Sequence, residues 1–86
     1  MAGNRVGEVA HYFDRINVAV INLSDTLQIG EMVHFLGHGV DFQQEVTSLQ
    51  IEHEPVSTAG KGQQVAVKVS KPVKAHTAVF KITVEE

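Results

Sequence analysis

Residues 64–70 read Gln-Val-Ala-Val-Lys-Val-Ser, and this stretch decides the fold. Val65, Val67 and Val69 alternate with residues that are small or polar. Successive side chains of a β-strand point to opposite faces, so this period of two places the three valines on one buried face. The same period returns in residues 80–84, which indicates that half-buried strands repeat along the chain.

Alternating apolar residues, separated by short polar links, predict six strands. These are expected at residues 5–12, 16–23, 31–37, 41–54, 64–70 and 77–84. The fourth run contains a change of phase, because Phe42 points one way by parity and Leu49 points the other. A β-bulge near Thr47 and Ser48 would reconcile the two halves and bend the strand.

The fold class expected from this pattern is all-β, in the form of a small closed six-stranded antiparallel β-barrel. Closure of a bent sheet into a barrel leaves no exposed strand edge. The chain has 86 residues, which suits a single domain over residues 1–86 with an ordered core at about 5–84. No stretch shows sustained helical spacing.

Composition bounds the location of the protein and excludes some chemistry. The sequence has no cysteine, which excludes disulfides, thiolate catalysis and cysteine-based zinc sites and favours the cytoplasm. No apolar run approaches the ~18 residues of a membrane span, and the first residues contain no apolar stretch typical of a signal peptide. We therefore expect a cytoplasmic protein without a membrane partner.

The lysines are concentrated in the last third of an otherwise acidic chain. The formal net charge is −3, which argues against a general nucleic-acid binder. Residues 61–86 nevertheless hold five lysines, namely Lys61, Lys68, Lys71, Lys74 and Lys81. They are explained either as solvated, edge-protecting lysines or as a patch that follows phosphate groups. In the second case, Lys61 and Lys68 are candidate RNA contacts.

The histidines do not predict a metal site. Zinc needs three or four ligands that converge on one ion. His34 and His38 would lie more than ~12 Å apart along a strand, and no third ligand lies close by in the sequence. We expect no metal and no other cofactor.

Signals for catalysis or nucleotide binding are weak. Glu52 and Glu54 flank His53, and carboxylates at i and i+2 on a strand share a face about 7 Å apart, which suits acid–base catalysis. A solvated cluster at a strand end explains the same residues. The Gly60-Lys61-Gly62 run lacks the spacing of a phosphate-binding loop, so no nucleotide site is expected. We do not expect an enzyme.

Four runs together carry a likeness to a known family: residues 6–9 (VGEV), 26–33 (TLQIGEMV), 46–51 (VTSLQI) and 55–67 (PVSTAGKGQQVAV). In order and spacing they resemble the β-barrel second domain of translational GTPases such as elongation factor Tu and initiation factor 2. The resemblance covers about residues 5–84 and is nearest to stand-alone translation elongation factor-like proteins. A similar barrel also occurs at the C-terminus of collagenase-like peptidases, which implies a detached accessory module.

The resemblance implies two site residues. In the elongation factor, a glutamate and an arginine at the end of the fourth strand help to hold the aminoacylated 3′ end of tRNA. Gln50 stands where that glutamate would be, and His53 stands where the arginine would be. Gln50 keeps hydrogen-bonding capacity, whereas His53 is not a permanent cation and attracts phosphate less strongly. The GTPase domain is absent, so GTP hydrolysis is not implied.

The expected function is a non-catalytic binding module related to the translation-factor barrel, acting with a protein partner or with RNA and the translation machinery. The alternative is direct binding of the tRNA 3′ end through Gln50, His53 and the basic segment 61–81. A small hydrolase that uses Glu52, His53 and Glu54 is a third interpretation.

Overall fold

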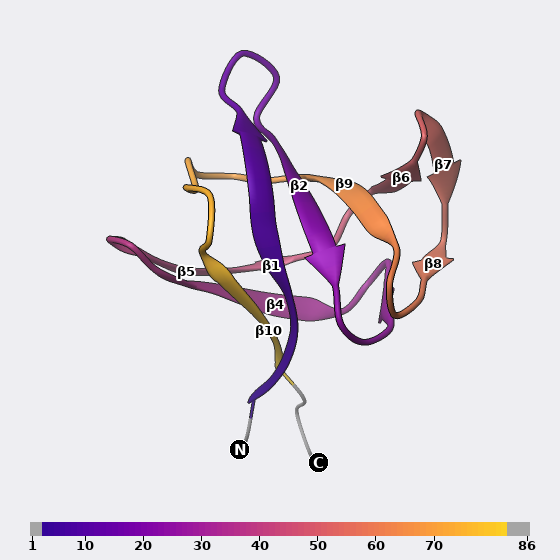
Figure 1. The fold of residues 1–86 in the computed structure, drawn as a ribbon, viewed down its shortest axis with the longest axis horizontal. Helices are drawn as coiled ribbons and strands as arrows, with labels where there is room; N and C mark the ends of the chain where they lie inside the picture. The colour runs from indigo at the N-terminus through magenta and orange to yellow at the C-terminus, as the bar shows by residue number, and fades with distance from the viewer. Residues whose placement is uncertain (1–2, 83–86) are drawn as a thin grey trace.

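Ten strands make up the computed structural model, which describes residues 3–82 (Figure 1). They are β1 Gly3–Phe13, β2 Val18–Leu23, β3 Leu27–Gln28, β4 Met32–Gly37, β5 Val40–Glu45, β6 Leu49–Ile51, β7 Glu54–Val56, β8 Thr58–Ala59, β9 Gln64–Lys68 and β10 Ala78–Ile82. The expected all-β class is confirmed. Residues 83–84 of the last expected strand lie outside the described residues. Across residues 3–82 we find no helix long and apolar enough to cross a membrane.

Eight of the strands form one antiparallel sheet, in the order β5-β4-β10-β1-β2-β9-β6-β7. The other two, β3 and β8, pair with each other in a separate small sheet. The expected closed six-stranded barrel is wrong in its details, because the backbone pairing of the described residues is open, with β5 at one end and β7 at the other. Only the expected run 41–54 is divided, into β5, β6 and the start of β7, while β3 and β8 lie in segments where no strand was expected.

Two irregularities in β1 bend the sheet. The pairing of β1 with β10 shifts between Arg5 and Gly7, and its pairing with β2 shifts between Val9 and His11. An extra residue on one strand of a pair bends that strand and increases its twist. The sheet therefore curls around one core, and Figure 1 shows β1 running through its middle.

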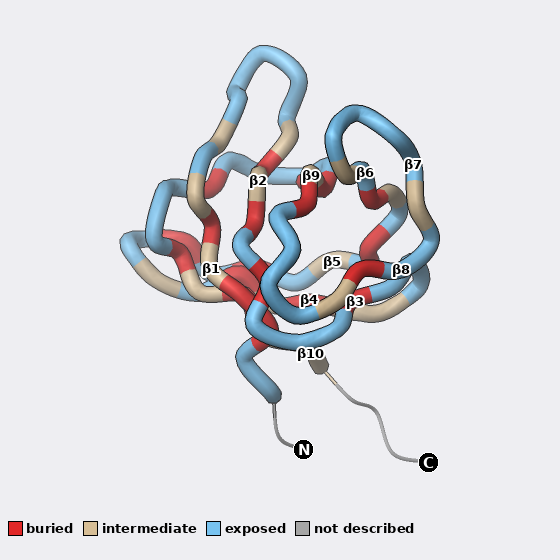
Figure 2. The backbone as a smooth tube through the Cα atoms, turned by 45° about the vertical axis from the view of Figure 1, so that its right-hand side comes forward, coloured by how far each residue is buried: buried red, intermediate tan, exposed pale blue. Residues whose placement is uncertain are grey.

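The core lies inside this curl. Val65, Val67 and Val69 are all buried, as the alternation in the sequence predicts. The other strands of the sheet bury alternate residues in the same way, and Figure 2 shows their buried segments as short red stretches facing the interior. Phe35 and Phe42 stack at the base of the core, with 5.1 Å between their ring centroids.

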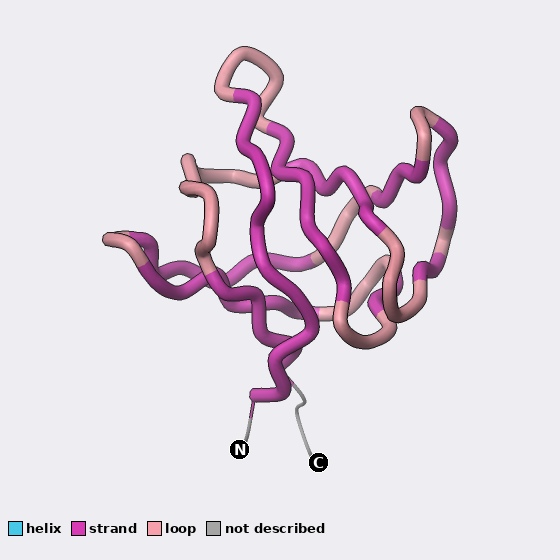
Figure 3. Tube along the Cα trace, in the orientation of Figure 1, coloured by secondary structure: helices cyan, strands magenta, loops and turns pink. Residues whose placement is uncertain are grey.

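The expected fourth strand, residues 41–54, is not one strand. Residues 46–48 form a loop between β5 and β6, and the chain turns at Glu52 and His53 before β7 (Figure 3). The predicted change of phase at Thr47 and Ser48 is thus present as a break rather than as a bulge. Its consequence is architectural, because β5 pairs with β4 while β6 pairs with β9. One continuous piece of chain consequently joins two distant parts of the sheet.

Candidate functional site

Two of the four predicted site residues lie close together on the outer face of the sheet. Gln50 of β6 pairs with Ala66 of β9, and its side chain is exposed. Lys68 is two residues beyond Ala66 and therefore faces the same side of β9. The structure thus places Gln50 and Lys68 near one another, although they come from strands well separated in the sequence.

The other two residues lie elsewhere. His53 is in the turn between β6 and β7, where Glu52 and His53 both have positive φ angles, 51° and 69°. Lys61 is in the turn before β9, at the opposite end of that strand from Lys68. The four residues therefore do not converge on one ligand-sized site.

The basic segment 61–81 is partly committed to contacts within the protein. Lys81 lies 3.4 Å from Glu31, and both side chains are mostly buried. The ammonium group of Lys71 lies 5.9 Å from the centre of the Phe42 ring. Lys81 is thus engaged within the fold, whereas Lys71 remains exposed although its ammonium group lies near Phe42.

Glu52, His53 and Glu54 are not joined to one another by side-chain hydrogen bonds. All three are exposed around the β6–β7 turn, and within residues 3–82 no hydrogen bond joins His53 to either carboxylate. The same part of the chain contains no group of three metal-binding side chains placed to hold an ion. The hydrolase interpretation therefore gains no geometric support.

A cluster that the sequence analysis missed joins β1 to the connection before β10. Nδ1 of His76 lies 2.8 Å from Glu8 Oε2, and Nη2 of Arg5 lies 3.1 Å from Glu8 Oε1. The hydrogen bond with His76, and then the charges of His76, Arg5 and His38, hold the pKa of the Glu8 carboxyl below its ordinary value of 4.5. Glu8 and His76 are 68 residues apart, so no local pattern could have found their contact.

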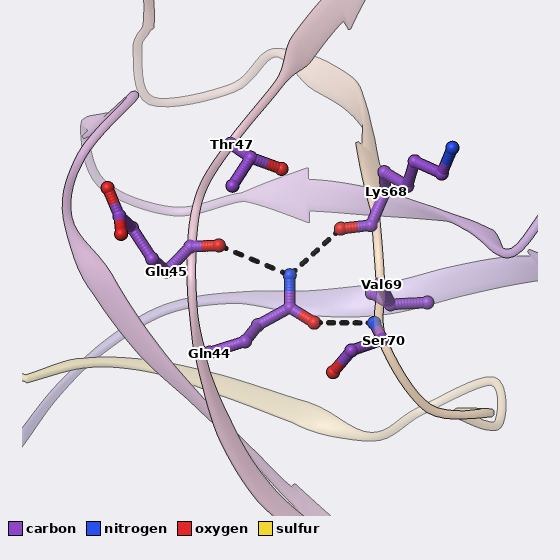
Figure 4. A pocket seen from close by; sticks show the side chains of 6 residues that line it. All are labelled: Gln44, Glu45, Thr47, Lys68, Val69 and Ser70. Atoms are coloured by element: carbon purple, nitrogen blue, oxygen red, sulfur yellow. Dashed lines mark hydrogen bonds between the residues drawn. The ribbon is translucent and has the colours of Figure 1, made fainter.

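A hollow of about 370 Å³ lies where β5 approaches the end of β9 (Figure 4). It is lined by Gln44, Glu45, Thr47, Lys68, Val69 and Ser70. The side chain of Gln44 crosses it: Nε2 donates to the Lys68 carbonyl at 2.8 Å, and Oε1 accepts from the Ser70 amide at 2.7 Å. The sequence did contain a clue to this residue. Gln44 is a polar residue on the same face of the strand as the buried Val40 and Phe42.

The turn between β1 and β2 carries exposed apolar side chains. Phe13 and Ile16 are 50% and 59% exposed, and Figure 1 shows this turn projecting beyond the rest of the sheet. A hydrogen bond of 3.1 Å between Tyr12 and Asn17 spans the base of the turn. We call residues 13–16 the hairpin tip. Ile16 was expected in a strand, but β2 begins only at Val18.

Comparisons with known proteins point to peptidases. No protein-family model matches the chain. The chain is 33% identical over 76 residues to an uncharacterised protease of Methanocaldococcus jannaschii, a match that covers 87% of this chain and 19% of the relative. The chain thus spans about a fifth of the length of this curated relative.

Two solved structures share the fold. Both are of the C-terminal domain of a Geobacillus thermoleovorans protein assigned to the U32 peptidases. One has a TM-score of 0.88 at 22% identity, with 93% of each chain covered. The other, its selenomethionine variant, has a TM-score of 0.85 at 22% identity, with 88% of this chain and 96% of that chain covered.

These findings correct the functional expectation. The predicted relationship to translation elongation factor-like proteins is wrong, and so is the predicted role as a module of the translation machinery. The alternative, direct binding of the tRNA 3′ end, has no support. The four matching runs combine turn glycines with alternating apolar residues. Both features are required wherever short strands begin and end at tight turns. Gly7, inside β1, instead meets a requirement of strand packing, since a Cβ there would lie 2.6 Å from the Asn22 carbonyl oxygen. Such runs describe a fold, and fold alone does not fix function.

Proposed function

We propose that this chain is a non-catalytic accessory domain that acts with a peptidase of the U32 type, and that its partner is a protein. The observation that carries this proposal is the 33% identity of nearly the whole chain to a segment amounting to 19% of a protease. The remaining four-fifths of that relative leaves ample length for a separate catalytic part. A domain of this kind would bind that part or help to position its substrates in the cytoplasm.

The geometry of the described residues supports a non-catalytic role. Nucleophilic catalysis needs a hydroxyl within hydrogen-bond reach of a base. Within residues 3–82, the Thr58 hydroxyl donates to the Leu27 carbonyl, and the Thr77 hydroxyl accepts from the Lys74 amide. The partner of each hydroxyl is thus a backbone group and not a basic side chain. The two histidine–carboxylate pairs, at His34 and His76, lie on exposed turns and strand faces rather than in a closed pocket.

The hairpin tip is the surface that best suits a protein partner. Phe13 and Ile16 expose large apolar side chains on a projecting turn. Exposed apolar groups that cluster on a protein surface are typical of interaction sites, and aromatic residues are enriched among the residues that dominate binding energy. We propose that the tip contacts the catalytic part of the peptidase.

A binding experiment in trans tests the proposal. The Methanocaldococcus protease would be produced without its matching 76-residue segment, and this chain would be titrated into it by isothermal titration calorimetry. We expect a dissociation constant in the micromolar range, about −8 kcal/mol. The excised segment of the relative is the positive control. Binding by that segment, with none by this chain at about 100 µM, would contradict the proposal.

An activity assay tests the non-catalytic part separately. The isolated chain should not hydrolyse a quenched-fluorescence peptide library at a rate above buffer. Hydrolysis by the isolated chain that disappears in His53→Ala would replace the accessory role with a catalytic one.

A further inference from the structure

The place where the curled sheet approaches itself is lined on one side by the edge of β5. Val46 donates its amide to the Glu31 carbonyl at 2.8 Å, so its backbone groups face the β4 side. Backbone groups of neighbouring residues in a strand point to opposite sides. Glu45, the last residue of β5, therefore directs its N–H and C=O groups away from β4, toward the hollow, where its carbonyl accepts from Gln44 Nε2 at 3.4 Å. We call the gap between residues 44–47 and 68–70 the seam.

The other side of the seam is also a strand edge. Val69 donates its amide to the Asn17 carbonyl at 2.8 Å, so its backbone groups face β2. By the same alternation, Lys68 and Ser70 face the seam. Two strand edges with backbone donors and acceptors thus confront each other across the hollow, without a strand between them.

The Gln44 side chain occupies the position that an added strand would take. Its amide donates to the Lys68 carbonyl at 2.8 Å and to the Glu45 carbonyl at 3.4 Å, and it accepts from the Ser70 amide at 2.7 Å (Figure 4). A primary amide offers one carbonyl acceptor and N–H donors, as a peptide unit does. The Gln44 amide therefore forms hydrogen bonds with the backbone groups of the seam as a peptide unit of an added strand would. Unlike a strand, it is a side chain that can rotate away.

We infer that the seam is a binding site for an extended peptide segment, which pairs with Lys68 and Ser70 by strand addition and displaces the amide of Gln44. Strand addition at a sheet edge gains affinity from main-chain hydrogen bonds, and side-chain pockets add specificity. The hollow of about 370 Å³ lies at the lower end of the volumes found for ligand sites. The site goes beyond the proposed function, because it belongs to this chain alone and does not require a peptidase.

The charges around the seam favour an acidic segment. Lys68 lines the hollow, and the Lys71 ammonium lies 5.9 Å from the Phe42 ring, so it reaches from the β9 side toward β5. Glu45 is the acidic residue on the opposite rim. A glutamate of the peptide beside the residue that pairs with Lys68 and Ser70 would be attracted to Lys68 and Lys71. A lysine at the same place would be repelled.

A titration followed by NMR tests the site with a defined probe, the capped heptapeptide Thr-Val-Glu-Val-Glu-Val-Thr. The amide signals of Glu45, Thr47, Lys68 and Ser70 should shift and saturate at submillimolar peptide. The same peptide N-methylated at its three central residues has no central N–H group to donate to the Lys68 carbonyl, and it should bind at least about tenfold more weakly. Equal binding by both peptides, or shifts confined to other surfaces, would overturn the inference.

Substitution of Gln44 tests displacement directly. Gln44→Ala removes the competing amide and should bind the peptide about fivefold more tightly, as expected for one net hydrogen bond released. The matched control is Gln43→Ala, an exposed neighbour on the other face of β5, which should leave affinity unchanged. Weaker binding by Gln44→Ala would contradict the inference.

Two further outcomes are decided by the same data. If Gln44→Ala does not fold, as judged by its amide dispersion, the comparison of the two peptides on the unmodified chain still decides the inference. Seam signals that shift with protein concentration alone, without peptide, would overturn it in favour of a second copy of this chain.

Discussion

At the scale of single residues, close contacts decide which positions tolerate change. Gly7 lies within the irregular part of β1, against β2. A Cβ at this position would lie 2.6 Å from the Asn22 carbonyl oxygen and 2.8 Å from Ile21 Cγ2. The first of these atoms is backbone, so the contact cannot be relieved by a side-chain rotation. The glycine is required because two strands approach closely, and not because of a turn.

We therefore expect Gly7→Ala to lower the free energy of unfolding by about 1–3 kcal/mol, the range of overpacked cores. Urea denaturation followed by circular dichroism measures this. Gly60→Ala is the matched control, because the nearest atom to a Cβ there is the Gln63 side-chain oxygen at 3.8 Å. It should change stability by no more than about 0.5 kcal/mol. Equal losses at the two positions would show that the close approach to β2 does not matter.

Glu8 gives a prediction about pH. Its carboxyl has a pKa below 4.5 in the folded protein, first because of the hydrogen bond with His76. A group whose pKa is depressed on folding stabilises the folded state above its unfolded pKa, and this stability is lost as the pH falls through the folded pKa. Thermal unfolding between pH 6 and pH 3 should therefore show a larger loss of Tm for the unmodified chain than for Glu8→Gln.

The control for this experiment is Glu54→Gln, which changes an exposed glutamate outside the Glu8 cluster. Its Tm should fall with pH as steeply as that of the unmodified chain. Parallel curves for the unmodified chain and Glu8→Gln would mean that the Glu8–His76 contact does not stabilise the fold. The Glu8 side chain is 40% exposed, so we expect a modest difference that decreases with added salt.

At the scale of strands and turns, local sequence predicted much of the structure. The period of two identified the buried face of β9, and the glycine at position 39 marked the turn between β4 and β5. These features depend on neighbouring residues only, so a single sequence contains them. The division of residues 41–54 was harder to predict, because the pairing of β6 with β9 depends on residues far along the chain.

The turn between β4 and β5 offers a test of local strain. Gly37 pairs with Val40, and the two linking residues, His38 and Gly39, have φ angles of 54° and 84°. Positive φ at both positions defines a type I′ turn, for which Asn-Gly is the preferred sequence. We expect His38→Asn to raise the free energy of unfolding by about 0.5–1 kcal/mol, because asparagine tolerates the left-handed conformation better.

Gly39→Ala tests the second turn position in the opposite direction. It introduces a side chain into open space but at φ +84°, and it should cost about 1 kcal/mol. Both variants can be compared by the midpoint of urea unfolding. A loss of stability in His38→Asn would indicate that the ring contact of His38 with His76, at 6.3 Å, outweighs the strain.

At the scale of the whole molecule, the sequence predicted the class of fold but not how the sheet ends. An all-β chain with one core follows from composition and period. Whether the sheet closes depends on a few contacts across the seam, where Gln44 bonds residues 24 and 26 positions away. Of the predicted site residues, Lys68 lies at the seam. Gln44, whose side chain spans the seam, was not predicted as a site residue. Function was predicted least well, because the matching runs describe strand starts that different protein families share.

The proposed docking of the hairpin tip concerns the whole molecule. It predicts that substitutions at the tip weaken binding to the peptidase without changing the stability of the fold. Phe13 and Ile16 are about half exposed and lie outside the buried core, so Phe13→Ser combined with Ile16→Ser should leave Tm within about 2 °C of the unmodified chain. The same double variant should bind the truncated Methanocaldococcus protease at least about tenfold more weakly, since apolar anchors at an interface typically contribute more than about 1 kcal/mol each.

Ile29→Ser is the matched control for this experiment. Ile29 is also a large apolar residue, 45% exposed, but it lies beside β3 and away from the tip. Its substitution should change neither Tm nor affinity. If Ile29→Ser weakens binding as much as the double variant does, the interface is a general apolar surface and not the tip. If the double variant binds normally, the projecting turn has another role, and the contact with the peptidase must lie on another face of the sheet.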